Sequence, residues 1–192
     1  MIIVLDTDRT ETDLAAGRLA CPRCGGSLRA WSWARARGVR QLDGSTRLVR
    51  PRRTRCGSCR STQVLLPAGL LPRRADAAEA IGAALLAKAR GVGYRAIAVD
   101  LQRPPSTVRR WLRRVRGEHV GWLRRQGIEQ ACRFDPEVIS DLPVQSTELG
   151  DALVALAAAV HAIRRRLARH AEAWTLIGVF TGGRLLGPTP AT

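Results

Sequence analysis

The sequence predicts a mostly α-helical protein with one small β module near its N-terminus. Four cysteines in two CxxC pairs lie among short stretches of alternating polar and apolar residues within 21–66, which is typical of a small metal-supported β-sheet. Beyond residue 73, apolar residues recur every three or four positions, as on one face of a helix. The 192 residues suffice for two or three such modules, each with a modest core.

The first twenty residues and the β module are predicted to contain short elements. Residues 2–5 favour a strand, and the capping side chains near Thr10 favour a helix that reaches Leu19. Within the module, alternation predicts strands over residues 28–37, 47–54 and 62–66. Two prolines after the last strand predict a boundary. We therefore predict an N-terminal strand and helix in 1–20 and a separate module in 21–66.

The rest of the chain is predicted to be helical. The helical spacing of apolar residues predicts a domain over 73–126 with four helices, at 75–90, 94–101, 106–116 and 118–126. The second and third are separated by a turn at Pro104 and Pro105, because a helix cannot continue through this pair. Residues 127–145, with one glycine and two prolines, are predicted to be a linker. A C-terminal segment, 146–192, would hold a long helix over 146–170 and a disordered tail.

Positive charge dominates the composition. The chain has 32 lysines and arginines against 16 acids, a net charge of +16, and Lys88 is the single lysine. The net charge is +10 over residues 1–74 and +7 over 75–127, but −1 over 128–192. The first two thirds of the chain are therefore predicted to meet a polyanion, and the arginine guanidinium suits phosphates and guanine edges.

The sequence predicts a cytoplasmic, nucleoid-associated protein. It has no run of about 18 apolar residues that would span a membrane, and its N-terminus lacks the basic region of a secretory signal. A reducing compartment makes a disulfide framework improbable. The paired cysteines are therefore better interpreted as metal ligands.

The two CxxC pairs, which we call the knuckles, predict a structural zinc site. Their four ligands would be Cys21, Cys24, Cys56 and Cys59. Each knuckle places two sulfurs on one side of a tight turn, and two knuckles complete a closed tetrahedral shell around Zn²⁺. Such a shell leaves no position for substrate. Alternatives are iron in a rubredoxin-like arrangement, a redox dithiol, or free buried thiols. The fifth cysteine, Cys132, has no CxxC partner and is interpreted as a plain small side chain.

A basic and aromatic stretch lies between the knuckles. Strand alternation would place Trp31, Trp33, Arg35 and Arg37 on one face. This face could contact nucleic acid, with bases stacked on the indoles. Alternatively, the tryptophans cover the small module and the arginines are merely solvated.

Residues 94–114 favour a helix–turn–helix. The predicted inward side chains are Ile97, Ala98, Leu101, Val108, Trp111, Leu112 and Val115. Ser106 is the predicted N-cap of the third helix, whose opposite face is rich in arginine. A helix fits the major groove with its N-terminal residues at base edges. A plain three-helix bundle with a solvated arginine face remains the alternative.

The helix–turn–helix supplies the candidate DNA-contacting residues. Base readout is assigned to residues on the first turns of the third helix, namely Ser106, Thr107, Arg109, Arg110 and Arg113. Phosphate contacts are assigned to Arg95, Arg114 and Arg116. The N-terminus of this helix would itself attract a phosphate.

The motifs CPRCGG, CGSC and GVGYRAIAVDLQRPPSTVRRWLRR carry a family resemblance. Over roughly residues 20–125 the chain resembles a domain-of-unknown-function family of high-GC bacteria, with a zinc ribbon followed by a homeodomain-like helix–turn–helix. It is also similar to the DNA-binding half of insertion-sequence transposases. The resemblance implies transposon- or transcription-linked DNA binding, with the four cysteines as zinc ligands and the helix at 106–116 as the DNA reader.

A complete transposase of this kind would add a catalytic domain with three carboxylates around two metals. Only 76 residues follow Arg116, and the acids among them are scattered. The protein is therefore predicted not to be an enzyme.

The predicted C-terminal helix has a heptad-like seam. Its members, spaced alternately by four and three, are Leu149, Leu153, Leu156, Val160, Ile163 and Leu167. The seam, continued by His170 and Trp174, favours a homodimer through residues 149–174. The alternative is an amphipathic helix packed on its own chain.

The sequence thus predicts a protein that binds double-stranded DNA, as a transcriptional regulator or mobile-element-associated factor. It would be mostly α-helical, with a zinc ribbon, a helix–turn–helix bundle and a long C-terminal helix. One alternative is an RNA-binding zinc-ribbon module with scaffolding helices. Another is a truncated transposase or recombinase fragment without its catalytic domain.

Overall fold

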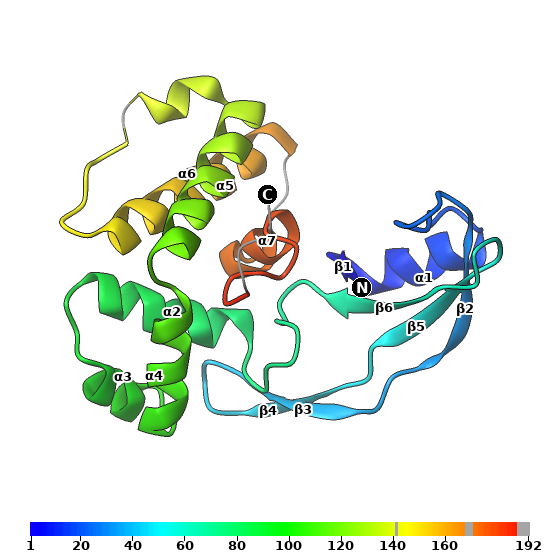
Figure 1. Cartoon of the computed structure of the whole chain (residues 1–192), viewed down its shortest axis with the longest axis horizontal. Helices are drawn as coiled ribbons and strands as arrows, with labels where there is room; N and C mark the ends of the chain where they lie inside the picture. The colour runs from blue at the N-terminus through cyan, green and yellow to red at the C-terminus, as the bar shows by residue number, and fades with distance from the viewer. Residues whose placement is uncertain (141, 168–170, 188–192) are drawn as a thin grey trace.

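A computed structural model describes residues 1–140, 142–167 and 171–187 (Figure 1). The N-terminal elements are β1 (Ile2–Val4), α1 (Thr7–Ala15), β2 (Leu28–Trp33), β3 (Arg37–Arg40), β4 (Thr46–Val49), β5 (Arg52–Cys56) and β6 (Thr62–Pro67). The helices that follow are α2 (Ala78–Ala89), α3 (Tyr94–Asp100), α4 (Pro105–Arg114), α5 (Glu118–Phe134), a 3₁₀ turn (Pro136–Ile139), α6 (Glu148–Leu167) and α7 (Ala173–Phe180). The predicted class, mostly helical with small sheets toward the N-terminus, is confirmed.

The strands form a four-stranded sheet and a separate hairpin. The sheet order is β1-β6-β5-β2, with β1 parallel to β6 and the other pairs antiparallel, whereas β3 and β4 form an antiparallel pair outside this sheet. The predicted strand over 28–37 is therefore two strands, and so is the one over 47–54. The first breaks at residues 34–36 and the second at Arg50 and Pro51, because the chain leaves the four-stranded sheet to form the hairpin and then returns to it.

Helix α1 starts and ends earlier than predicted. The carboxylate of Asp6 accepts hydrogen bonds from the N–H groups of Asp8 and Arg9, at 3.0 and 2.9 Å, and thereby caps the helix. The helix stops at Ala15 instead of reaching Leu19. Gly17 follows with φ +69°, a left-handed conformation that ends helices and that glycine adopts readily.

Helix α2 begins at Ala78, three residues later than predicted. The preceding residues pair with β3 instead. Arg40 donates its N–H to the carbonyl of Ala75 at 2.8 Å, and Ala77 donates to the carbonyl of Arg40 at 3.0 Å. This backbone pairing holds Asp76 and Ala77 extended. It also attaches the β3–β4 hairpin to the start of the helical part of the chain.

Helix α4 begins at Pro105, so the prediction that Ser106 is its N-cap is wrong. Pro104 is the N-cap and Pro105 is the first helical residue, where its fixed φ and missing N–H are tolerated. Ser106 lies within the first turn. The helix ends at Arg114, because Val115 leaves the helical conformation with ψ 74°, so Arg116 lies in the loop before α5.

Helix α5 extends to Phe134 and takes in part of the predicted linker. A Cβ on Gly127 would lie 2.5 Å from the carbonyl carbon of Ala155 in α6. This glycine therefore permits two helices to approach closely and does not interrupt the helix. Residues 136–139 then form the 3₁₀ turn, so only part of 127–145 is irregular.

Helices α2 to α7 share one hydrophobic cluster, with Ile81, Leu85, Leu123 and Leu156 among its fully buried members. The predicted domains 73–126 and 146–192 therefore pack together, and the boundaries given for them stay a prediction. In Figure 1 the α5–α6 pair lies above α2, and the β module lies beside the helices. Within the described ranges, no helix is both long and apolar enough to cross a membrane.

The seam of α6 lies inside the chain. Leu153, Leu156, Val160 and Ile163 are buried among side chains of the same molecule, whereas Leu167 is 50% exposed. This apolar face of α6 therefore packs on the rest of its own chain, as the alternative interpretation of the seam predicts. A homodimer through residues 149–174 stays a prediction that would need another face, and its continuation at His170 lies outside the described residues.

Candidate metal centre and basic helix

The two knuckles have matching backbone geometry. In the first, the N–H of Cys21 donates to the carbonyl of Gly26 at 2.7 Å. In the second, the N–H of Cys56 donates to the carbonyl of Ser61 at 2.9 Å. The residue after each second cysteine has a left-handed conformation, with φ 73° at Gly25 and 60° at Arg60. Both turns therefore direct two sulfurs to one side.

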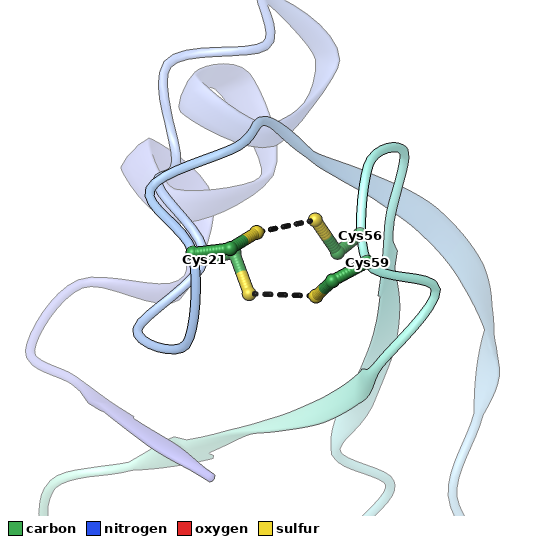
Figure 2. A group of neighbouring side chains, drawn as sticks. Cys21, Cys56 and Cys59 are labelled. Atoms are coloured by element: carbon green, nitrogen blue, oxygen red, sulfur yellow. Dashed lines mark hydrogen bonds between the residues drawn. The ribbon is translucent and has the colours of Figure 1, made fainter.

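The four sulfurs come together between the knuckles (Figure 2). Cys21 Sγ lies 3.8 Å from Cys59 Sγ, Cys24 Sγ lies 3.5 Å from Cys56 Sγ, and all four lie within 4.8 Å of one another. Sulfurs about 2.3 Å from a tetrahedral zinc ion would lie about 3.8 Å apart. The predicted ligand set is thus assembled with a spacing that fits a metal ion. Cys132 lies outside this cluster and is exposed.

Close approach of the knuckles depends on Gly26. A Cβ at this position would lie 2.5 Å from Ser58 Oγ and 3.3 Å from Cys56 Sγ. A side chain here would displace the Ser58 side chain and crowd the Cys56 sulfur. The absence of a side chain at Gly26 therefore allows the two knuckles to approach closely.

Neighbouring groups give the thiols different pKa values. Hydrogen bonds from the hydroxyl and N–H of Ser61 lower the pKa of Cys59 to about 6. At Cys24, the N–H of Gly26 lowers the pKa. The thiols of Cys59 and Cys56 outweigh it and raise the pKa of Cys24 to about 11. Four thiolates repel one another without a cation, and a bound divalent ion would offset that repulsion.

Helix α4 separates an apolar face from an arginine face. Val108, Trp111 and Leu112 are buried, as is Val115 beyond the helix end, and the predicted inward side chains of α3 are buried with them. The opposite face exposes residues predicted to contact DNA, namely Ser106, Arg109, Arg110, Arg113 and Arg114, with Thr107 half-buried. Within the described chain, none of these arginines forms an ion pair.

The structure brings two of the other predicted residues next to Arg109. Hydrogen bonding and charge from Arg95, and more weakly from Arg109, lower the pKa of Tyr94. Arg109 and Arg116 line one cavity of about 370 Å³ together with Tyr94 and Lys88. Arg95, Arg109 and Arg116 therefore surround the N-terminal end of α3, whereas Arg114 faces a different cavity.

The tryptophans of β2 are exposed, and arginine side chains from β5 lie over their rings. Trp31 is 55% exposed and Trp33 is 46% exposed. Arg55 lies 4.7 Å from the ring centroid of Trp31, and Arg52 lies 4.6 Å from that of Trp33. The predicted shared face with Arg35 and Arg37 is not formed as a strand face, because the register shifts after Ala30 and β2 ends at Trp33. Neither indole is buried by the module.

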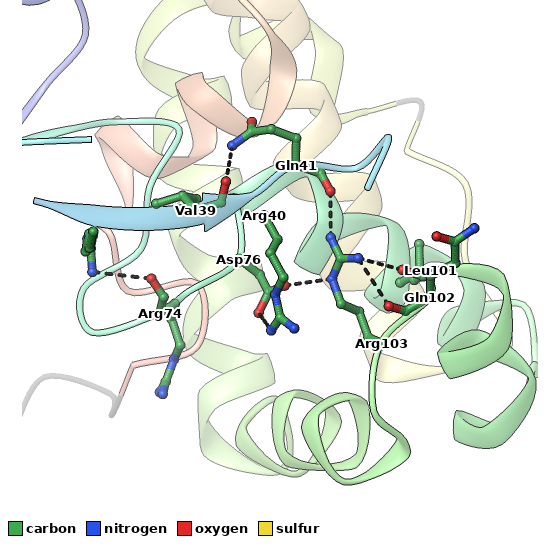
Figure 3. A network of polar contacts seen from close by, with 9 residues as sticks. Val39, Arg40, Gln41, Arg74, Asp76, Leu101, Gln102 and Arg103 are labelled. Atoms are coloured by element: carbon green, nitrogen blue, oxygen red, sulfur yellow. Dashed lines mark hydrogen bonds and ion pairs between the residues drawn. The ribbon is translucent and has the colours of Figure 1, made fainter. Parts of the chain in front are cut away.

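A buried ion-pair network was not predicted from the sequence (Figure 3). Asp76 accepts from Arg103 Nε at 2.7 Å and from Arg40 Nη2 at 2.8 Å, and the side chains of Asp76 and Arg103 are each 3% exposed. Arg103 also donates to the carbonyls of Leu101 at 2.9 Å and Gln41 at 2.6 Å. The network joins the β3–β4 hairpin, the start of α2 and the turn before α4.

Residues 21–111 match a family described as a domain of unknown function (DUF6431). The match includes both knuckles, the Asp76–Arg103 pair and most of α4, whereas α5 to α7 lie outside it. It agrees with the resemblance to a domain-of-unknown-function family. Searches of curated proteins and of solved structures give no match.

Proposed function

We propose that this protein binds double-stranded DNA through α4 and acts as a transcriptional regulator or mobile-element-associated factor. The observation that carries the proposal is the exposed arginine face of α4. Arg109, Arg110 and Arg113 stand on the surface without carboxylate partners among the described residues. Clustered guanidinium groups on one helix face attract a polyanion, and a helix of this size fits the major groove.

The arrangement of α3 and α4 supports a helix–turn–helix interpretation. At the end of α3, Gln102 has φ 51°, its N–H donates to Val99, and the N–H of Arg103 donates to Ala98. These bonds form a tight C-terminal cap, after which Pro105 starts α4. The connection is therefore short and fixed, as a reader helix requires.

The position of each residue on α4 suggests its role. Base readout is proposed for Ser106, Thr107, Arg109 and Arg110 on the first turns, and for Arg113, which lies in the last turn. Arg114 lies at the end of the helix and Arg95 and Arg116 lie outside it, so phosphate contacts are proposed for these three. The proposal therefore separates residues that set sequence preference from residues that set affinity.

Replacing Arg109 or Arg113 by alanine tests the readout. The expected result is a loss of about 1–3 kcal/mol in preference for a selected duplex over a scrambled one, because the bidentate contact to guanine is gone. The duplex comes from in-vitro selection of bound sequences, and the measurement is fluorescence anisotropy at fixed salt.

Arg166→Ala is the matched control, since it removes one exposed arginine on α6, far along the chain from α4. It should reduce affinity slightly and equally for both duplexes. An unchanged preference in both α4 variants, or failure of the selection to enrich any sequence, would contradict readout by α4.

We further propose that the knuckles hold Zn²⁺ as a structural ion, with Cys21, Cys24, Cys56 and Cys59 as ligands. Four thiolates at tetrahedral spacing favour zinc, and iron is the alternative for the same donor set. Four protein ligands fill the coordination shell, so the ion would stabilise the module and take no part in a reaction. The protein is accordingly proposed not to be an enzyme, and magnesium- or manganese-dependent cleavage of the bound duplex would contradict this.

RNA binding by the β module is a second candidate, favoured by the exposed indoles of Trp31 and Trp33 and the arginines stacked on them. Aromatic side chains on a basic surface stack with unpaired bases. Competition between duplex DNA and single-stranded RNA over a salt series distinguishes the two functions. We expect the protein to bind duplex DNA more tightly than single-stranded RNA. Arg113→Ala should weaken duplex binding, and Trp31→Ala should leave duplex binding unchanged. The reverse pattern would favour RNA.

A further inference from the structure

A cavity of about 630 Å³ lies beside the C-terminal end of α4. Its wall comes from four places that are distant in sequence. These are Met1, the segment 71–74 before α2, Arg114 of α4, and the segment 182–187 after α7. Four arginines line it, namely Arg73, Arg74, Arg114 and Arg184, and we call this cavity the arginine pocket.

The arginine pocket has uncompensated positive charge. Among the described residues, no carboxylate lines it, and none of its four arginines forms an ion pair. Arg74 is half-buried, and its pKa is lowered by burial and by the charges of Arg114 and Arg110. Like charges held this close repel one another, and an anion between them would remove the repulsion.

The wall of the pocket is held in place by backbone contacts. The carbonyl of Arg74 accepts from Arg37 Nη1 at 3.3 Å, and Arg73 has φ 58°, a conformation that a side chain makes unfavourable. On the opposite side, a Cβ on Gly183 would lie 3.0 Å from Ile3 and 3.2 Å from Pro72. The segments 71–74 and 182–187 are therefore packed closely against each other at Pro72 and Gly183.

The chemistry of the lining indicates the class of ligand. Arginine's planar fork matches phosphate oxygens, and its charge persists at all physiological pH values. The volume lies within the range of small-molecule sites, and the buried side chains of Leu71 and Leu186 supply an apolar floor. We propose that the arginine pocket binds a phosphate group, either on a free phosphorylated molecule or on the backbone of a nucleic acid that continues past α4.

Pyrophosphate is the probe, measured by isothermal titration against sodium chloride of the same ionic strength. We expect saturable binding to the whole protein, and at least a tenfold loss of affinity in both Arg74→Gln and Arg184→Gln. Arg166→Gln, which removes an exposed arginine that does not line the pocket, should bind as the unchanged protein does. Circular dichroism checks that each variant is folded.

The same variants tested on duplex DNA distinguish the two sources of phosphate. For a free ligand, pyrophosphate binds and Arg184→Gln leaves duplex affinity unchanged. For a backbone phosphate, Arg184→Gln weakens duplex binding and lowers its salt slope by about 1. Either result supports the pocket. No pyrophosphate binding beyond the chloride control, together with unchanged duplex binding and salt slope in Arg184→Gln, overturns it.

Failure of this inference can be separated from failure of the proposed function. Arg113 lies on α4 but does not line the arginine pocket. If α4 does not bind DNA, Arg113→Ala has no effect on duplex binding, and pyrophosphate binding by the pocket is unaffected. If the pocket is not a phosphate site, Arg113→Ala still weakens duplex binding.

Discussion

Replacing Cys24 by serine is expected to unfold the β module over residues 21–66 and to leave α2 to α7 folded. The hydrophobic cluster beneath the sulfurs is small. Its buried members are Val4, Leu14, Cys21, Leu28, Cys56 and Leu65, so two of the six are themselves proposed ligands. Structural zinc contributes about 10–16 kcal/mol to the folding of zinc-finger peptides. Loss of one ligand should remove more stability than this cluster can supply by itself.

The measurement is hydrogen exchange resolved by segment, together with metal content. The unchanged protein should hold one zinc ion per chain, and Cys24→Ser should lose both the ion and the protection of β2, β5 and β6. The β3–β4 hairpin should retain protection longest, because Val39 packs with Leu70 and Ala77 next to α2. Treatment with a strong chelator should reproduce the same pattern in the unchanged protein.

Cys132→Ser is the matched control. This cysteine is exposed and lies outside the cluster, so its replacement should change neither the metal content nor the exchange. Full protection of 21–66 in Cys24→Ser would show that the module folds without the metal. Loss of protection throughout the chain would show that the predicted boundary between Pro67 and Pro72 is wrong.

The elements that the sequence predicts well are those set by local patterns. Each knuckle is a turn of a few residues, so its cysteines and glycines suffice to define it. The buried face of α4 follows from spacing alone, since Val108, Trp111 and Leu112 repeat at helical intervals. The ends of this helix differ from the prediction by one or two residues. Pro104 and Pro105 compete with Ser106 for the cap, and Val115 ends the helix before Arg116.

The elements that the sequence does not predict depend on contacts between distant segments. In the sequence, Gly127 is compatible both with the end of a helix and with close packing of two helices. Only the position of the α6 backbone shows that the second applies. The seam of α6 likewise suits a second copy or the chain's own helices. Asp76 and Arg103 are 27 residues apart, and no periodicity connects an acid to an arginine across a sheet–helix junction.

Asp76→Ala is expected to lower the free energy of unfolding by about 3–5 kcal/mol, the usual cost of leaving a buried charge unpaired. Arg103 is 3% exposed and cannot turn to solvent, whereas Arg40, 36% exposed, can. The loss therefore comes mainly from Arg103. Adding Arg103→Leu should recover part of it, because the unpaired charge is then gone. Urea unfolding measures both variants.

An exposed pair of similar length is the control. Arg18 Nη2 lies 2.7 Å from Asp13 Oδ1, but both side chains reach solvent. Asp13→Ala should therefore cost at most about 1 kcal/mol. Two results would contradict the view that burial makes Arg103 dependent on Asp76. One is an equal loss of unfolding free energy in Asp13→Ala and Asp76→Ala. The other is a double variant, Asp76→Ala with Arg103→Leu, that is less stable than Asp76→Ala alone.

The same network connects stability to the proposed DNA contact. Arg103 directly precedes the two prolines that start α4, and its guanidinium holds Gln41 of the hairpin and Asp76 before α2. In Asp76→Ala the turn loses the contact that fixes where α4 begins, although every arginine of α4 remains. Duplex affinity should therefore fall at temperatures well below the unfolding midpoint, with the salt slope unchanged, because the number of phosphate contacts that can form is the same. A fall in the salt slope would instead indicate that the variant loses phosphate contacts directly.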